Sequence, residues 1–194
     1  MFTNRFINQI SKNNLYRNLS VRPKKNVNIF IRNAITQLKT DSEIKKTETV
    51  IDTLKNINSD KYNPIFLTNV LNAHTQKDNI KKEYTPKEFR DARLDLVSRS
   101  DIFVFIYDEN SLSVSGGFEL GYWFNKNKND YNKYTVIILM NTMSTSLVKM
   151  LPNTTYIQLD NRYTLDNNHF PNLIKLPSLE QLPNTFMNIL NKYE

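Results

Sequence analysis

Residues 101–124 read Asp101-Ile-Phe-Val-Phe-Ile-Tyr-Asp108, then Glu-Asn-Ser-Leu-Ser-Val-Ser115, then Gly-Gly-Phe-Glu119-Leu-Gly-Tyr-Trp-Phe124. The first part is a run of apolar and aromatic residues without a polar interruption, which is typical of a strand buried on both faces of a parallel sheet. A polar loop and then a helix are expected to follow it. Because open α/β sheets bind their ligands at the carboxyl ends of the strands, this loop is a candidate binding site.

Segments of the same two kinds alternate along the rest of the chain. Apolar, β-branched runs predict strands at 27–31, 63–67, 101–108, 134–140 and 155–159. Apolar residues at helical spacing predict helices at 42–57 and 86–99, one that ends near Lys126, and two more at 144–151 and 178–192. The alternation predicts an α/β fold of the flavodoxin-like (Rossmann-like) class: a five-stranded parallel sheet in the order 2-1-3-4-5, with helices on both faces. The strand at 155–159 is more polar than the others and is expected at an edge.

The glycines of the chain are concentrated in one place. There are only three, Gly116, Gly117 and Gly121, whereas about 7% glycine is usual. Their retention beside the end of a strand predicts that a ligand approaches the backbone closely, where a Cβ would prevent contact. Glu119 follows Ser115 by about one helical turn, where free amides and the helix dipole favour an anion. The structural alternative is a loop–helix junction with a capping serine and a glutamate in the first turn.

Composition and charge argue against several classes of protein. The net charge of +7 arises from residues 1–40, which carry eight Lys/Arg and no acid, while the remaining 18 basic residues face 19 acidic ones. The near-neutral body argues against a nucleic-acid-binding protein. No apolar stretch is long enough to span a membrane, so we expect a cytoplasmic protein. The absence of Cys excludes disulfides and thiolate metal sites, and two His cannot make a His-rich metal cage.

The length of the chain predicts one domain, at 26–194, preceded by a basic arm at 1–25. The arm carries Phe2, Phe6, Ile10 and Leu15 at nearly helical spacing. It is expected to be a short helix docked on the domain or on a partner. A transit peptide has a similar composition and is the alternative.

The segment Ser113-Val-Ser-Gly-Gly-Phe-Glu119-Leu-Gly-Tyr122, after a strand that begins at an Asp, resembles the signature of the nucleoside 2-deoxyribosyltransferase superfamily. The resemblance implies a flavodoxin-like domain that needs no cofactor and cleaves or transfers at the N-glycosidic bond of a 2′-deoxynucleoside or its 5′-monophosphate, as in nucleotide salvage. It gives Glu119 the role of the nucleophile that attacks the anomeric carbon of the sugar. It also implies a homo-oligomer, because members of the family commonly close the pocket with a neighbouring subunit.

The substrate-binding residues follow from the same resemblance. Ser113 stands where many transferases of the family have an Asp, and in this it is similar to the 2′-deoxynucleoside 5′-phosphate N-hydrolase branch, which holds the substrate phosphate with a Ser. Ser115 and the amides of Gly116 and Gly117 could complete a phosphate nest. The strand order places Asn33, just after the first strand, in the same cleft as Glu119. A phosphate there needs positive charge, for which Arg32, Arg90 and Arg93 are the candidates.

Two positions depart from the family pattern. Arg93 stands where an Asp is usual, with Asp91 and Asp95 on either side, and Phe30 replaces a Tyr whose hydroxyl positions the Glu. Flanking residues such as Asp91 could substitute, the activity could be altered, or the chain could be a nucleotide-binding relative that no longer catalyses. An NAD-cleaving domain similar to Toll/interleukin-receptor domains, with a Glu on the corresponding helix, and a non-enzymatic binding module are the further alternatives.

Overall fold

The computed structural model describes residues 23–33, 40–67, 85–108, 114–140, 153–159, 165, 170 and 172–192. The arm up to residue 22, nearly all of the polar segment 68–86 and the expected helix at 144–151 lie outside these residues. The first described strand already includes Lys25, the last residue assigned to the arm.

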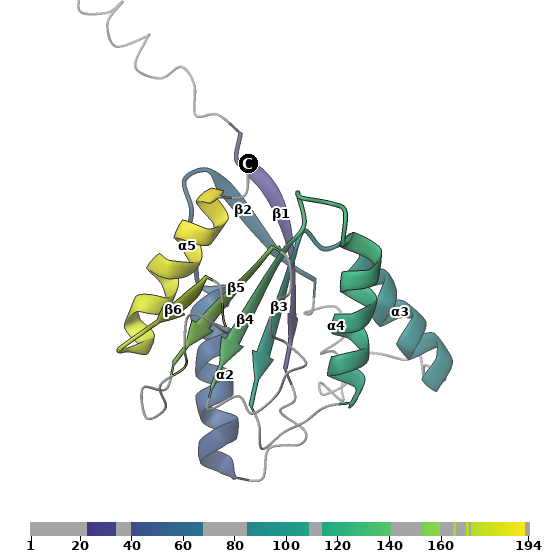
Figure 1. Ribbon diagram of the computed structural model, residues 1–194, viewed down its shortest axis with the longest axis horizontal. Coiled ribbons are helices and arrows are strands. Elements are labelled where there is room, and N and C mark those ends of the chain that lie inside the picture. Colours follow the sequence, from purple (N-terminus) through teal and green to yellow (C-terminus); the bar gives the residue numbers. More distant parts are fainter. Residues whose placement is uncertain are drawn as a thin grey trace, which may run out of the picture.

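The core of the fold is a parallel sheet of six strands in the order β2-β1-β3-β4-β5-β6 (Figure 1). All five strand pairs are parallel. The strands are β1 (Lys25–Arg32), β2 (Tyr62–Phe66), β3 (Ile102–Tyr107), β4 (Tyr134–Leu139), β5 (Thr154–Gln158) and β6 (Leu173–Lys175). The predicted α/β class is confirmed, and the predicted order of the first five strands is found as well.

The prediction of five strands was wrong by one. The additional strand, β6, lies within a segment that was expected to be a loop. It has only three residues, and so short a segment shows no alternation of apolar and polar residues that would predict a strand. Because β6 pairs with β5, the expected edge position of β5 was also wrong. Every residue of β5 is buried, and its polar residues are part of the interior rather than a solvated edge.

Four α-helices and a 3-10 turn complete the described structure. They are α2 (Asp41–Lys55), α3 (Pro86–Arg99), α4 (Val114–Asn127), the turn η6 (Leu179–Gln181) and α5 (Leu182–Lys192). Two helices begin at capping boxes, in which Thr40 pairs with Glu43 and Thr85 pairs with Glu88. Each box satisfies amides that the first turn leaves open. In the described residues, no helix combines the length and apolar character needed to cross a membrane.

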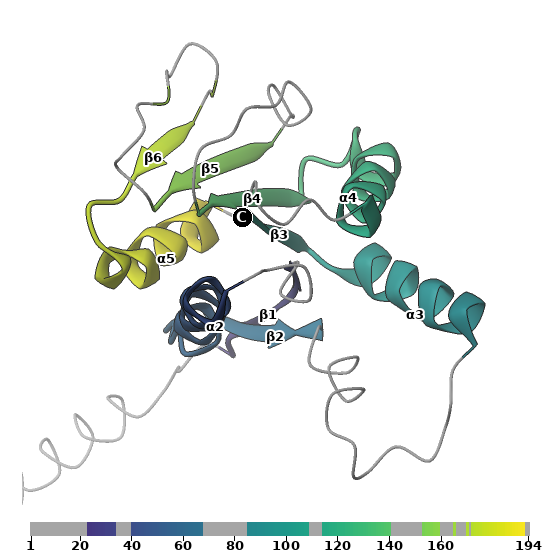
Figure 2. The ribbon, with the colours of Figure 1, turned by 90° about the horizontal axis from the view of Figure 1, so that it is seen from below.

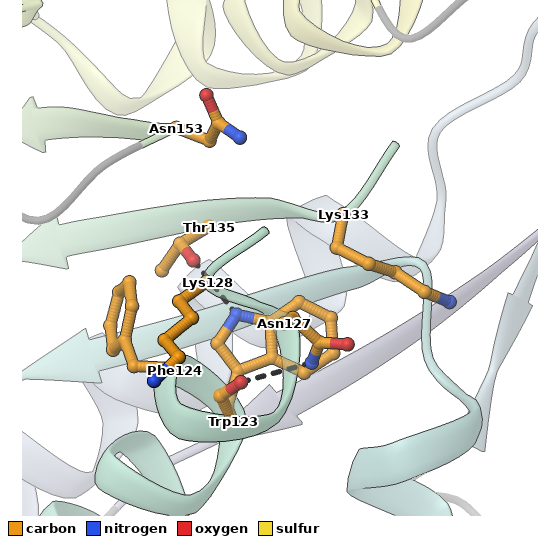
Figure 3. A pocket seen from close by; sticks show the side chains of 7 residues that line it. All are labelled: Trp123, Phe124, Asn127, Lys128, Lys133, Thr135 and Asn153. Atoms are coloured by element: carbon orange, nitrogen blue, oxygen red, sulfur yellow. Dashed lines mark hydrogen bonds between the residues drawn. The ribbon is translucent and has the colours of Figure 1, made fainter. Parts of the chain in front are cut away.

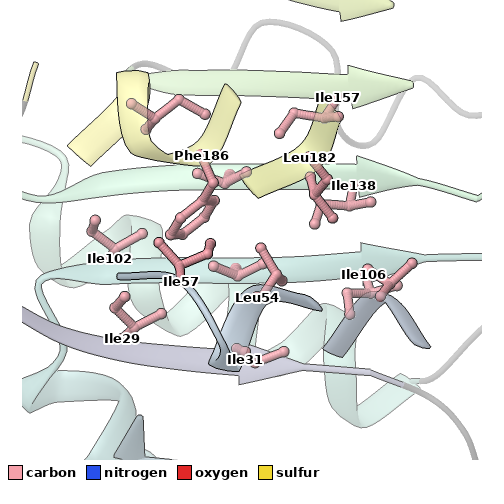
Figure 4. Packing of buried hydrophobic residues seen from close by; sticks show 14 of the residues in the cluster. Ile29, Ile31, Leu54, Ile57, Ile102, Ile106, Ile138, Ile157, Leu182 and Phe186 are labelled. Carbon is pink, nitrogen blue, oxygen red and sulfur yellow. The ribbon is translucent and has the colours of Figure 1, made fainter. Parts of the chain in front are cut away.

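The helices form two layers that cover the two faces of the sheet (Figure 2). Alternate strand residues point to α2 and α5 on one face, where Ile29, Ile102 and Ile138 pack against Leu54 and Phe186 (Figure 4). The other residues of the same strands point to α3 and α4 and form an aromatic core that contains Phe30, Phe103, Trp123 and Tyr156. Because β3 is buried on both faces, the apolar run that predicted it has no polar interruption.

A buried hydrogen bond fixes α4 on the sheet. Trp123 is 2% exposed, and its Nε1–H donates to Oγ1 of Thr135 on β4 at 2.9 Å (Figure 3). We expect Thr135→Val to lower the free energy of unfolding by about 1–3 kcal/mol, because the indole N–H would be left without a partner. Chemical denaturation measures this change. Thr135→Ser keeps the hydroxyl and is the control, and equal losses in both variants would show that the methyl group, not the hydrogen bond, matters.

Candidate functional site

A charged cluster lies where β1 ends, on the face of the sheet that α3 and α4 cover. Arg32 is the last residue of β1, and strand alternation puts it on the same face as Phe30, which packs in the α3/α4 core. Ser115 and Glu119 are four residues apart on α4 and therefore share one side of that helix. Arg93 comes from α3. Three segments far apart in the sequence, β1, α3 and α4, thus supply one cluster of four side chains, called here the Glu119 cluster.

Two guanidinium groups hold the Glu119 carboxylate. Arg93 binds it in a bidentate manner, with Nε 2.8 Å from Oε1 and Nη2 3.1 Å from Oε2. Nε of Arg32 forms an ion pair with Oε2 at 2.9 Å, and its Nη2 donates to Oγ of Ser115 at 2.7 Å. Nη1 of Arg32 donates to the backbone carbonyl of Asn33. Bidentate, charge-assisted contacts of this kind fix the position of a carboxylate as well as stabilising its charge.

The cluster is removed from solvent. Glu119 is 4% exposed, and the side chains of Arg32 and Arg93 are 14% and 19% exposed. Burial lowers the pKa of Arg32 from its ordinary value, the Glu119 carboxylate raises it, and Arg93 lowers it. A guanidinium remains protonated in proteins, so the cluster carries two positive charges and one negative charge. Its net charge of about +1 leaves it suited to an anion.

The helix dipole contributes less to Glu119 than the sequence suggested. The helix begins at Val114, earlier than expected, and its first turn contains no acidic residue. Glu119 is therefore the sixth helical residue, and dipole effects fall off within the first turn. The two arginines, rather than the helix terminus, balance the carboxylate.

Arg93 and Phe30, the two departures from the family pattern, contact each other. The guanidinium carbon of Arg93 lies 5.8 Å from the centre of the Phe30 ring and 5.7 Å from that of Phe89. Cation–π contacts at such distances stabilise a guanidinium, and the rings limit the directions in which it can move. The position and orientation of Arg93 toward Glu119 are therefore set by its own helix and by the first strand.

The glycines lie inside α4 rather than in a loop before it. None of them has a positive φ, and a Cβ added to Gly117 or Gly121 would meet no atom within 4 Å. Neither a backbone turn nor packing against the described residues accounts for Gly117 and Gly121, although glycine within a helix costs about 1 kcal/mol relative to alanine. The approach of a ligand or a partner to this backbone stays a prediction. Gly116 is buried and Gly117 is exposed.

The other predicted substrate-binding residues are placed differently. Ser113 lies outside the described residues. Asn33 follows β1 and accepts from Arg32 through its backbone carbonyl. Asp91 lies on the exposed side of α3, where Arg90 binds its carboxylate at 3.0 Å, so the described structure does not bring its side chain into the Glu119 cluster.

A shallow pocket lies at the opposite end of the sheet. Trp123, Lys128, Lys133 and Asn153 are among the residues that line it, near the amino ends of β4 and β5 (Figure 3). It has room for about one water molecule, and Lys133 is engaged by Asp101 at 3.0 Å. This pocket is too small for a nucleotide. Within the described ranges, no group of three or more His, Asp or Glu side chains could hold a metal ion.

Sequence reasoning named Arg32 as one of three possible phosphate partners but did not connect it with Glu119. Strand periodicity could have indicated the contact, since Phe30 and Arg32 are two residues apart in a strand and therefore point to the same face of the sheet. The pairing of Glu119 with Arg32 and with Arg93 could not be predicted from spacing along the chain, because these residues are 87 and 26 positions away from it.

No known protein family matches the sequence, and no curated protein matches it. The structure is similar to a CMP N-glycosidase, BcmB, from Clostridium botulinum, with a TM-score of 0.45 and 12% identity over 82% of this chain and 97% of that one. It is also similar to the minimal Ste5 VWA domain subject to autoinhibition by the Ste5 PH domain, with a TM-score of 0.31 and 14% identity over 96% and 98% of the two chains. At these TM-scores neither likeness carries an argument about what this chain does.

Proposed function

We propose that the chain is an N-glycosidase that cleaves the bond between base and sugar in a 2′-deoxynucleoside 5′-monophosphate, with Glu119 as the nucleophile. The observation that carries the proposal is the carboxylate of Glu119, buried at the carboxyl end of the sheet and held by two arginines. A buried ion pair adds little to stability compared with apolar packing, so its presence at the ligand-binding end of the sheet favours a functional role. The signature around Glu119 supplies the type of reaction.

The contacts of Glu119 leave one oxygen suited to attack. Oε2 accepts a hydrogen bond from Nη2 of Arg93 and forms an ion pair with Nε of Arg32, whereas among the described residues Oε1 is contacted by Nε of Arg93 alone. Oε1 therefore keeps a lone pair that can form a bond to the anomeric carbon, while the electrons of the C–N bond leave with the base. Water then breaks the new ester bond and restores the carboxylate. Both steps pass through oxocarbenium-like states that a carboxylate stabilises.

The charge of the Glu119 cluster favours a phosphorylated substrate. Two guanidinium groups face one carboxylate, and Ser115 on the exposed side of Arg32 adds a hydroxyl. A phosphate bound near Ser115 and Arg32 would meet this surplus of positive charge, and charge-assisted hydrogen bonds are about twice as strong as neutral ones. Ser113 and the amides of Gly116 and Gly117 remain part of the proposed phosphate subsite.

The two departures from the family pattern compensate for each other in this proposal. The family's Tyr in the first strand positions the Glu through its hydroxyl, and Phe30 has none. Arg93 takes over that task, because its two hydrogen bonds orient the carboxylate and the Phe30 ring lies against its guanidinium. A working nucleophile is thus compatible with both substitutions.

Incubation with pairs of phosphorylated and unphosphorylated substrates tests the function. The set contains the four deoxynucleosides, the corresponding ribonucleosides, the 5′-monophosphates of both and NAD, and chromatography detects the free base. We expect base release from at least one deoxynucleoside 5′-monophosphate, faster than from its nucleoside. Release of nicotinamide from NAD alone would support the Toll/interleukin-receptor-like alternative instead. If no base is released from any of them, the enzymatic proposal is wrong.

A second function, nucleotide binding without cleavage, is favoured by one feature of the same site. Both oxygens of Glu119 are engaged by arginines, as in a carboxylate with a purely structural role. Tight binding of a monophosphate in the same set, measured by calorimetry and without any base release, would identify this case.

A further inference from the structure

Tyr107 carries a buried hydroxyl that the Glu119 cluster does not use. It is the last residue of β3 and is 7% exposed. Within the part of the chain that the structure describes, its hydroxyl oxygen is buried and has no hydrogen-bond partner. Most buried side-chain polar groups are hydrogen-bonded, and leaving one unsatisfied destabilises the folded chain. Because this hydroxyl lies at the end of the sheet where ligands bind, a ligand is a candidate for its missing hydrogen-bond partner.

The strand register places Tyr107 beside the Glu119 cluster. Arg32 pairs with Phe105 across β1 and β3, and Tyr107 is two residues further along β3 in the direction of its carboxyl end. Phe105 and Tyr107 belong to the same core, on the face covered by α3 and α4, and their ring centres are 6.2 Å apart. Arg32 and Tyr107 are thus diagonal neighbours on one face, which places them roughly 7–8 Å apart between Cα atoms.

Charge is distributed unequally across this end of the sheet. On the face covered by α3 and α4, the Glu119 cluster lies at the end of β1, whereas the row that starts at Tyr107 is neutral and continues through Leu139 of β4 to Gln158 of β5. Leu139 and Gln158 are both buried, at 0% and 1% exposed. Neighbouring strands are about 4.8 Å apart, so this row extends about 10 Å from Tyr107. Because this row carries no charge, an uncharged heterocycle placed beside it at Tyr107 is favoured over a phosphate.

We propose that the Tyr107 hydroxyl is a specificity-determining group that forms a hydrogen bond with the base of the substrate. The inference rests on the proposed function and adds to it the direction in which the nucleotide lies: phosphate and sugar over β1 at the Glu119 cluster, base over β3 and β4. A tyrosine hydroxyl both donates and accepts, so it can bind a ring nitrogen or an exocyclic oxygen. The bond is made only in the complex, which explains why the hydroxyl has no partner in the described chain.

The test compares two substitutions of the same chemical kind, Tyr107→Phe and Tyr134→Phe. Tyr134 lies at the amino end of β4, and its hydroxyl is hydrogen-bonded to Oγ1 of Thr155 at 2.6 Å. Calorimetry gives the affinity of the full chain for nucleoside 5′-monophosphates, for the free bases and for ribose 5-phosphate. Thermal unfolding without ligand gives the stability of each variant.

Tyr107→Phe is expected to weaken binding of the free base and of the monophosphate about tenfold or more, a factor that corresponds to about 1.4 kcal/mol. Binding of ribose 5-phosphate should not change. The melting temperature of the Tyr107→Phe variant should stay the same or rise, because the substitution removes an unsatisfied hydroxyl. Tyr134→Phe should bind all three ligands as the wild type does and melt about 2–4 °C lower.

The possible results separate the two proposals. Base release that Tyr107→Phe leaves unchanged, in rate and in affinity, overturns the role of Tyr107 and leaves the proposed function in place. Binding that depends on Tyr107 without any base release overturns the glycosidase and supports the base site. If Tyr107→Phe melts lower than the wild type, the hydroxyl has a structural partner and the inference is wrong. It is also wrong if the wild type binds none of the bases or monophosphates.

Discussion

Glu119→Gln is expected to lower the free energy of unfolding by about 3–5 kcal/mol, the range found when one partner of a buried ion pair is removed. The substitution keeps the size of the side chain but removes its charge, so the guanidinium groups of Arg32 and Arg93 would face each other without a carboxylate between them. For a first-turn glutamate at a helix terminus, the loss would be only about 0.3–1 kcal/mol. The expected loss is larger for Glu119 because its carboxylate is buried between two arginines.

Urea denaturation of the wild type and the variant measures this effect. Asp91→Asn is the matched control, because it removes the charge of a carboxylate that also pairs with an arginine but is 52% exposed. Exposed ion pairs contribute about 0–1 kcal/mol, so the control should unfold almost as the wild type does. A second substitution, Arg93→Met in the Glu119→Gln protein, should recover part of the stability, since it removes one of the two unpaired charges. Equal small losses in both single variants would contradict the buried cluster.

The sequence was sufficient where a local pattern determines the structure. The apolar run of β3 and the bounds of α3 at 86–99 were predicted correctly because each depends on neighbours in the chain. The three residues of β6 were missed because a strand so short has no period. The polar residues of β5 were assigned to an edge, although pairing with β6 buries them. The burial of β5 depends on its pairing with β6, which begins about fifteen residues further along the sequence.

The site could be predicted only in part for the same reason. Glu119 was proposed as a site residue from its position after a strand and from a short motif, and its role stays a prediction. Its pairing with Arg32 and Arg93 depends on how α3, α4 and β1 meet, which no local pattern specifies. Tyr107 was included in an apolar run because its ring packs like the phenylalanines before it. Only the absence of a partner for its hydroxyl among the described residues distinguishes it from them.

Glu119→Asp separates the catalytic role of the carboxylate from its contribution to stability. Aspartate keeps the negative charge between Arg32 and Arg93, so this variant should lose less stability than Glu119→Gln. Its carboxylate is one methylene shorter, and a displacement of about 1 Å from the reacting carbon can cost about a hundredfold in rate. We therefore expect kcat/KM for base release to fall at least about a hundredfold, while the affinity for the intact monophosphate changes little.

The measurement is single-turnover base release at a temperature at which circular dichroism shows both variants folded. Rapid quenching followed by mass spectrometry of the intact chain should find the mass of the sugar phosphate attached to the wild type, since a nucleophilic carboxylate forms a covalent intermediate. Neither Glu119 variant should carry this added mass. If Glu119→Asp releases base as fast as the wild type does, Glu119 is not the nucleophile. The two arginines then hold it for stability alone, and the attacking group is to be sought elsewhere at this end of the sheet.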